Sequence, residues 1–85
     1  MPIRILYFAW VREAVGAAEE TVEPPATIAT VAALIGWLTQ RSAGHALAFA
    51  DPARLRAAVD QSFVSLDASI LGAVEVAIFP PVTGG

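Results

Sequence analysis

The chain is short, apolar and mildly acidic. It has 85 residues, 56% of them hydrophobic, a formal net charge of -3, five arginines, no lysine and no cysteine. This length fits one small domain, because a second hydrophobic core needs more residues. The lack of cysteine excludes a thiol nucleophile and disulfides, and the arginines are too scattered to predict a nucleic-acid partner.

The apolar residues are too many for so small a core and too dispersed for a membrane span. The longest apolar runs, 5–11 and 31–38, are far shorter than the roughly 20 residues that cross a bilayer. Residues 1–11 lack the pattern of a secretory signal, so we expect no membrane partner and a cytoplasmic protein. The apolar surplus predicts an exposed apolar face.

The first part of the chain predicts a pair of strands. Residues 3–9 are rich in β-branched and aromatic side chains, which is typical of a strand. Residues 11–15 predict a short helical turn before Gly16. The acidic segment 19–23, closed by two prolines, predicts an edge strand that pairs with the first strand as a hairpin.

A helix is predicted from Thr27 onward. Apolar residues recur there at the spacing of one helix face: Ile28, Val31, Leu34, Ile35 and Leu38. Thr27 or Thr30 is expected to cap the start, and Gly44 is expected to end the helical region. Residues 46–50 then form a short connector.

The rest of the chain predicts further strands. Residues 54–61 alternate polar and apolar side chains, residues 63–65 are a short extended piece, 67–72 a turn, and 74–79 a last strand that two prolines stop. The element order predicts an α+β domain over residues 1–79, with a mixed sheet packed on one main helix. A β-grasp roll fits this order.

Strand alternation gives each strand an inward and an outward face. The side chains expected to point inward are Ile3, Ile5, Tyr7, Leu55, Ala57, Val59, Val74, Val76 and Ile78. The outward face then holds Leu6, Phe8, Ala58, Ala77 and Phe79, bordered by Arg4, Arg56, Asp60 and Glu75. An apolar centre with a charged border favours a protein-binding surface. The alternative is that the segment 45–52 folds over this face as a second small core.

The chain closes with a six-residue tail, 80–85, of sequence Pro-Pro-Val-Thr-Gly-Gly. The prolines favour an extended exit from the domain, and six extended residues reach roughly 20 Å. Gly84 and Gly85 have no side chains, so this end can thread a channel too narrow for other residues.

The reactive group of this tail is the α-carboxylate of Gly85. With a reference pKa of about 3.5 it is ionised at neutral pH, and it is a poor electrophile until it is activated. Adenylation by a partner enzyme would supply a leaving group. Attack by a sulfur donor would then leave a thiocarboxylate, whereas attack by an amine would leave an amide. An inert, frayed tail is the alternative.

Three segments together resemble one family. Residues 75–85 end in Phe-Pro-Pro-Val-Thr-Gly-Gly, and with the opening residues 5–13 and the middle residues 58–64 they are similar to the MoaD family, the small subunit of molybdopterin synthase. The resemblance covers essentially the whole chain, and the closing motif is its specific part. Two positions depart from the family pattern: Ala73-Val74 replaces the usual Gly-Asp, and Asp60 stands where Asn is common.

The resemblance implies a ubiquitin-like β-grasp fold and a sulfur-carrier cycle. An E1-like enzyme of the MoeB type would use ATP to adenylate Gly85, which would become a thiocarboxylate. The tail would enter the large synthase subunit, MoaE, in a heterotetramer, and its sulfur would build molybdopterin from cyclic pyranopterin monophosphate. No cofactor is bound directly and the chain alone is not catalytic. A thiamine-pathway carrier of the ThiS kind, a ubiquitin-like modifier and a plain interaction domain remain alternatives.

The resemblance also implies which residues act. The reactive end is Gly84 and Gly85, and the partner contacts are Phe8, Phe63, Phe79, Pro80, Pro81, Val82 and Thr83. No chemistry is expected of the other polar and aromatic candidates. His45 is expected in a loop or at a helix end, and the acidic segment 19–23 at a solvated edge without a metal. Trp10 and Trp37 either contact a partner or cap the core, and the arginines rim the contact surface.

Overall fold

The computed structural model describes residues 2–81, which form one mixed sheet with helices packed against it. In chain order the elements are β1 (Ile3–Tyr7), α1 (Ala9–Val15), β2 (Glu19–Val22), α2 (Val31–Thr39), α3 (Ala43–Ala48), the 3-10 helix η1 (Pro52–Arg54), β3 (Arg56–Val59), β4 (Ser62–Val64) and β5 (Glu75–Phe79). The strand order is β2-β1-β5-β3-β4, in which only β1 and β5 pair in parallel. The predictions of an α+β fold, of a first hairpin and of an edge position for β2 are confirmed.

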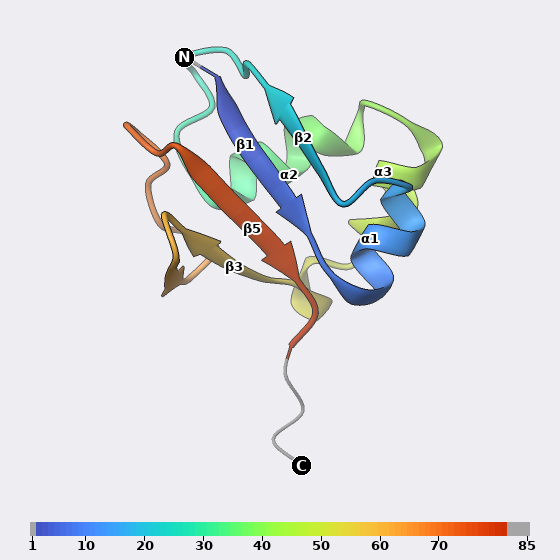
Figure 1. Ribbon diagram of the computed structural model, residues 1–85. Coiled ribbons are helices and arrows are strands. Elements are labelled where there is room, and N and C mark those ends of the chain that lie inside the picture. The colour runs from blue at the N-terminus through green and yellow to red at the C-terminus, as the bar shows by residue number, and fades with distance from the viewer. Residues whose placement is uncertain (1, 82–85) are drawn as a thin grey trace.

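One face of the sheet packs on the helices, which lie behind and beside the strands in Figure 1. The core joins inward residues of the sheet, such as Ile5, Val76 and Ile78, to the buried stripe of α2. Ile5, Val76 and Ile78 are completely buried, and each such side chain stabilises the fold by roughly 1.5–3 kcal/mol. Within residues 2–81, no helix is long and apolar enough to cross a membrane.

The main helix begins after the later of its two predicted caps, so the prediction of Thr30 is confirmed. Thr30 is the cap of α2, because its hydroxyl oxygen accepts a hydrogen bond from the backbone N–H of Ala33 at 3.1 Å. The helix therefore begins at Val31 and not at Thr27, and Ile28 packs on the core from the preceding turn. The side-chain cap decides the boundary, since it satisfies a backbone donor that the first helical turn leaves free.

The prediction that Gly44 ends the helical region is wrong. Gly44 lies inside α3, where a β-carbon at this position would come within 2.4 Å of the carbonyl oxygen of Ala14. Glycine is needed here because α1 and α3 approach each other closely, and close approach is a tertiary property. The chain reverses instead between Thr39 and Ser42, whose hydroxyl caps α3.

The turn between β3 and β4 has two central residues with left-handed backbone angles. Asp60 and Gln61 have φ angles of 48° and 72°, the pattern of a tight hairpin turn. One carboxylate oxygen of Asp60 accepts hydrogen bonds from the N–H groups of Val74 and Glu75, at 2.9 and 3.0 Å. Aspartate suits this position because both neighbours are donors, so the departure from asparagine leaves the turn intact.

Replacing Gly44 with alanine is expected to destabilise the fold by about 1–3 kcal/mol, because the new methyl group overpacks the α1–α3 contact. Gly36→Ala is the matched control, since Gly36 also lies inside a helix but has nothing within 4 Å of an added β-carbon. Helix propensity favours that change by about 1 kcal/mol. Urea unfolding measures both, and equal stability changes would contradict the close contact.

Candidate functional site

The face of the sheet opposite the helices, here called the outer face, carries one continuous row of side chains. The strand register aligns Glu19, Leu6, Ala77, Ala58 and Phe63 across the five strands. In the neighbouring rows, Phe79 lies opposite Arg56 and Arg4 lies opposite Glu75. Cross-strand partners share a face, so the outward direction of Leu6, Ala58, Ala77 and Phe79 is confirmed, whereas Phe8 follows β1 and takes part in no strand pair.

The apolar part of the outer face is concentrated near the end of β5. Phe63 is 85% exposed and Phe8 is 47% exposed, whereas Ala58 and Ala77 are buried between their neighbours. The ring centroids of Phe63 and Phe79 are 5.7 Å apart. The predicted apolar centre is therefore present, but the two alanines are covered. Its exposed area is contributed by the phenylalanines.

The alternative that the segment 45–52 covers the outer face is wrong. His45 and Phe49 pack against Tyr7 on the helix side of the sheet, with ring centroids 6.0 and 6.2 Å from that of Tyr7. Helix α3 places them there, because its buried residues belong to the same core as α2. The outer face is therefore left open at Phe8 and Phe63.

Val74 does not join the inward set. It is 69% exposed and precedes β5, which begins at Glu75. The N–H of Val74 donates a hydrogen bond to the carboxylate of Asp60 in the β3–β4 turn. The strand therefore begins one residue later than predicted, at Glu75.

The charged border of the outer face is uneven. Arg4 pairs with Glu75 at 2.7 Å and lies 4.0 Å from Glu19, and the hydrogen bond and charge of Glu75 raise the pKa of Arg4. Arg56, at the other end of the face, donates to the backbone oxygens of Ala53 and Leu55. Not every arginine lies on this border, because Arg41 contacts Glu20 on the helix side.

The tail begins at the apolar end of the outer face. β5 ends at Phe79, and Pro80 and Pro81 follow without secondary structure and half-buried. Because β1 and β5 are parallel, this end of β5 lies away from the end of the sheet where β1 starts (Figure 1). The predicted reactive and contact residues 82–85 lie outside the described residues.

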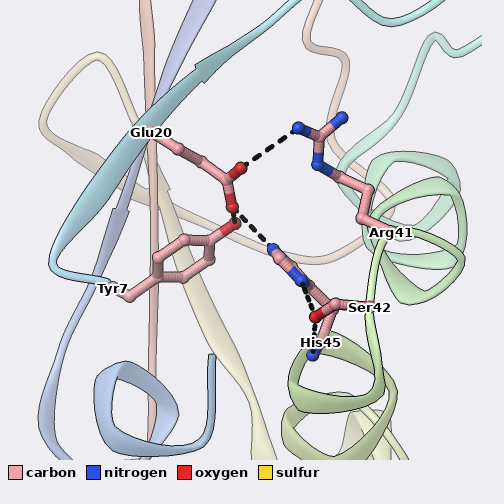
Figure 2. A network of polar contacts seen from close by, with 5 residues as sticks. All are labelled: Tyr7, Glu20, Arg41, Ser42 and His45. Atoms are coloured by element: carbon pink, nitrogen blue, oxygen red, sulfur yellow. Dashed lines mark hydrogen bonds and ion pairs between the residues drawn. The ribbon is translucent and has the colours of Figure 1, made fainter. Parts of the chain in front are cut away.

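A polar network that the sequence does not predict lies on the helix side (Figure 2). One carboxylate oxygen of Glu20 accepts a hydrogen bond from the Tyr7 hydroxyl at 2.7 Å and lies 2.6 Å from Nε2 of His45. The other oxygen lies 3.3 Å from the Arg41 guanidinium, and the Ser42 hydroxyl lies 2.7 Å from Nδ1 of His45. The network links β1, β2 and α3.

The network corrects one expectation. Glu20 is half-buried and hydrogen-bonded on the core side of the edge strand β2, and is not simply solvated there. His45 lies in the last turn of the short helix α3, so its expected place at a helix end is confirmed, and it is buried. Strand parity, which points Glu20 away from Glu19, was a signal for its inward direction. Nothing in the sequence pairs it with His45, which is 25 residues away.

The order Ser42, His45, Glu20 resembles a nucleophile, base and acid, but its local geometry is that of a helix cap. The Ser42 oxygen accepts the backbone N–H of His45 at 3.1 Å, as the capping residue of α3. That bond uses one of the two lone pairs of the hydroxyl oxygen and fixes it at the start of α3. We therefore assign the network a structural role.

The environment of Glu20 sets its protonation. Desolvation raises its pKa, but hydrogen bonds with His45 and Tyr7 and the charges of His45 and Arg41 lower it further, so the net pKa lies below the ordinary value of 4.5. Burial and the hydrogen bond with Glu20 raise the pKa of Tyr7, which stays a neutral donor.

The two tryptophans cap the core from its rim. Both pack partly buried against the core, and each carries an arginine over its ring: Arg54 lies 4.7 Å from the centroid of Trp10, and Arg41 lies 5.5 Å from that of Trp37. These contacts are within the range of cation–π attraction. The core-capping alternative accounts for both residues.

Comparison with known proteins identifies the family. The ThiS family matches residues 5–85. The chain belongs to this family. It is 46% identical to the molybdopterin synthase sulfur carrier subunit of Escherichia coli (strain K12), over 98% of this chain and 99% of that relative.

Solved structures agree on the fold. The putative molybdopterin converting factor, subunit 1, of Pyrococcus furiosus is 29% identical, with a TM-score of 0.74 over 96% of this chain and 99% of that one. SAMP1 of Haloferax volcanii superposes over the whole of both chains with a TM-score of 0.72 at 21% identity, a likeness of fold alone. The fold is the ubiquitin-like β-grasp, as the resemblance implied.

The depressed pKa of Glu20 makes stability depend on acid pH. The network is fully formed above pH 4.5, and its contribution is lost as the pH falls through the lower pKa that Glu20 has in the folded chain. Glu20→Gln is expected to lower stability at pH 7 by about 1–3 kcal/mol and to flatten the acid dependence. Thermal unfolding between pH 7 and pH 3 measures this, with the exposed Glu23→Gln as control. Parallel pH curves for wild type and Glu20→Gln would contradict it.

Proposed function

We propose that this protein is the sulfur-carrier small subunit of molybdopterin synthase. The observation that carries the proposal is the 46% identity, along almost the full length of both chains, to the E. coli subunit of that name. The closing motif, residues 75–85, resembles the same family. The thiamine-pathway carrier and the protein modifier share the tail chemistry, but neither is supported by a comparable sequence identity over the full chain.

The architecture supports a carrier that docks by its sheet and presents its tail. The exposed ring of Phe63 lies on the outer face, Phe8 is exposed directly after β1, and Phe79 is the last residue of β5 before the tail. A partner that covers this face receives the chain from Pro80 onward at the edge of the contact. The apolar face supplies binding energy, and the tail supplies the reactive group.

The chemistry is centred on the carboxylate of Gly85. Its oxygen attacks the α-phosphorus of ATP in the activating enzyme, which releases pyrophosphate and leaves an acyl adenylate. Attack of hydrosulfide, the simplest sulfur nucleophile, on the carbonyl carbon expels AMP and leaves a thiocarboxylate. In the large subunit that sulfur forms a bond to carbon of cyclic pyranopterin monophosphate, and water then cleaves the acyl–sulfur bond, which returns the carboxylate of Gly85. Gly84 and Gly85 let the tail pass through a narrow channel, and Val82 and Thr83 line its contact with the partner.

The proposed partners follow from this cycle. They are a MoeB-like activating enzyme, which uses ATP, and a MoaE-like large subunit, with which the chain forms a heterotetramer in the cytoplasm. The chain itself binds no cofactor and is not catalytic alone. Phe8, Phe63, Phe79, Pro80 and Pro81 contact both partners in turn.

The proposed tail chemistry predicts a mass change at the C-terminus. Incubation with the activating enzyme, ATP and a sulfur source is expected to replace one oxygen of Gly85 by sulfur, which intact-protein mass spectrometry detects. Gly85→Ala, or one added residue, is expected to abolish sulfur transfer. The methyl group of alanine does not fit the narrow channel, and an added residue moves the reactive carboxylate out of place in the partner's active site. Both variants should unfold at the wild-type temperature, since β5 ends at Phe79.

Three outcomes separate the proposal from its alternatives. An unchanged terminus in the wild-type chain would leave a plain interaction domain. A thiocarboxylate without a stable complex with the large synthase subunit would favour the thiamine pathway. Covalent attachment to protein lysines would favour a modifier.

The outer face is expected to carry partner binding. Phe63→Asp should weaken binding of the large subunit by about tenfold or more, because it places a charge in the apolar contact. Its stability should be close to that of the wild type, since the ring is 85% exposed. Leu47→Asp is the control: Leu47 is 71% exposed but lies on α3. Calorimetric titration measures both variants, and equal losses of affinity would place the contact elsewhere.

A further inference from the structure

Arg56 is a charged residue on the outer face, beside the exposed phenylalanines. It lies opposite Phe79 across the β3–β5 pair, and with Phe63 and Val64 these residues border a shallow hollow of about 210 Å³. The hollow lies at the end of the face from which the tail departs. A cation therefore stands at the edge of the apolar contact that we propose for the large subunit.

The guanidinium of Arg56 is held in place from one side only. Its Nη1 donates to the backbone oxygens of Leu55 at 2.8 Å and Ala53 at 3.2 Å. Nε and Nη2 make no hydrogen bond or ion pair with any residue in the range 2–81. These two nitrogens form the edge of the guanidinium that accommodates a carboxylate through two parallel hydrogen bonds.

The other charges of the outer face are already matched. Arg4 has Glu75 and Glu19, at 2.7 and 4.0 Å, and these three residues lie toward the opposite end of the strands from Arg56. The apolar end of the face thus carries a positive charge with no carboxylate of residues 2–81 against it. A partner that buries Phe63 and Phe79 also removes water from Arg56, and a desolvated cation without an anion is costly.

We propose that Arg56 is a specificity-determining residue that pairs, through Nε and Nη2, with a carboxylate on the large synthase subunit. An apolar side chain of the same partner fills the hollow that Phe63, Phe79 and Val64 border. This inference rests on the proposed function and deepens it, since it states which chemistry the partner presents at the start of the tail. The anchored Nη1 reduces the entropy lost when the pair forms.

The test uses the full-length chain and the large subunit of the same organism. Arg56→Gln is expected to weaken binding by tenfold or more in calorimetric titration at low salt. Arg56→Lys should recover only part of the affinity, because an ammonium cannot form the two parallel bonds. Arg41→Gln is the matched control, with the same change of net charge on the helix side, and should bind within twofold of wild type. The difference between wild type and Arg56→Gln should shrink at high salt.

The remaining outcomes decide against the proposal. Equal affinity of Arg56→Gln and Arg41→Gln would overturn the pairing, as would full recovery by Arg56→Lys. Tighter binding by Arg56→Gln would assign Arg56 to the carboxylate of the chain's own tail, which roughly 20 Å of extended chain can bring back to the face. Absence of any complex with the wild-type chain would remove the proposed function and this pairing together. Thermal unfolding of each variant shows whether a loss of affinity comes from the contact or from the fold.

Discussion

The parallel pairing of β1 with β5 at the centre of the sheet is the constraint on which the other features depend. Its register places Ile5 beside Val76 on the core side and Leu6 beside Ala77 on the outer side. A slip of one residue would exchange the two faces, and burial of Ile5, Val76 and Ile78 prevents that slip. The same pairing directs the end of β5, and the prolines that follow it, away from the end where β1 starts (Figure 1).

Because the helices cover one face only, the two sides of the sheet differ in burial and in function. The core side has apolar packing and one polar network, in which Tyr7, Glu20 and His45 satisfy each other. In residues 2–81, no buried side-chain nitrogen or oxygen lacks a hydrogen-bond partner. The outer side has exposed phenylalanine rings and Arg56, of which only Nη1 is hydrogen-bonded within residues 2–81. Stability is thus provided on one side, and the other is left free for partners.

Periodicity was enough to predict most elements and the division of the strands into two faces. Periodicity failed at positions whose structure depends on contacts between segments distant in the chain. Gly44 was expected to end a helix, but it allows α1 and α3 to approach, and this contact is made by a carbonyl some thirty residues earlier. His45 has Ser42 as a partner in its own segment, but its other ring nitrogen lies against Glu20 on β2, 25 residues away. Val74 was drawn out of the strand by Asp60.

The sequence by itself determined the fold class, the outward set around Phe8 and Phe79, and the family, because alternation, helical spacing and the closing motif are local patterns. The apolar surplus noted from composition has its place on the outer face. Only the tertiary structure decided that the half-buried Glu20 pairs with the buried His45 and that one edge of Arg56 remains open. These depend on distances between side chains remote in the chain or on hydrogen-bond geometry, and no spacing rule contains them.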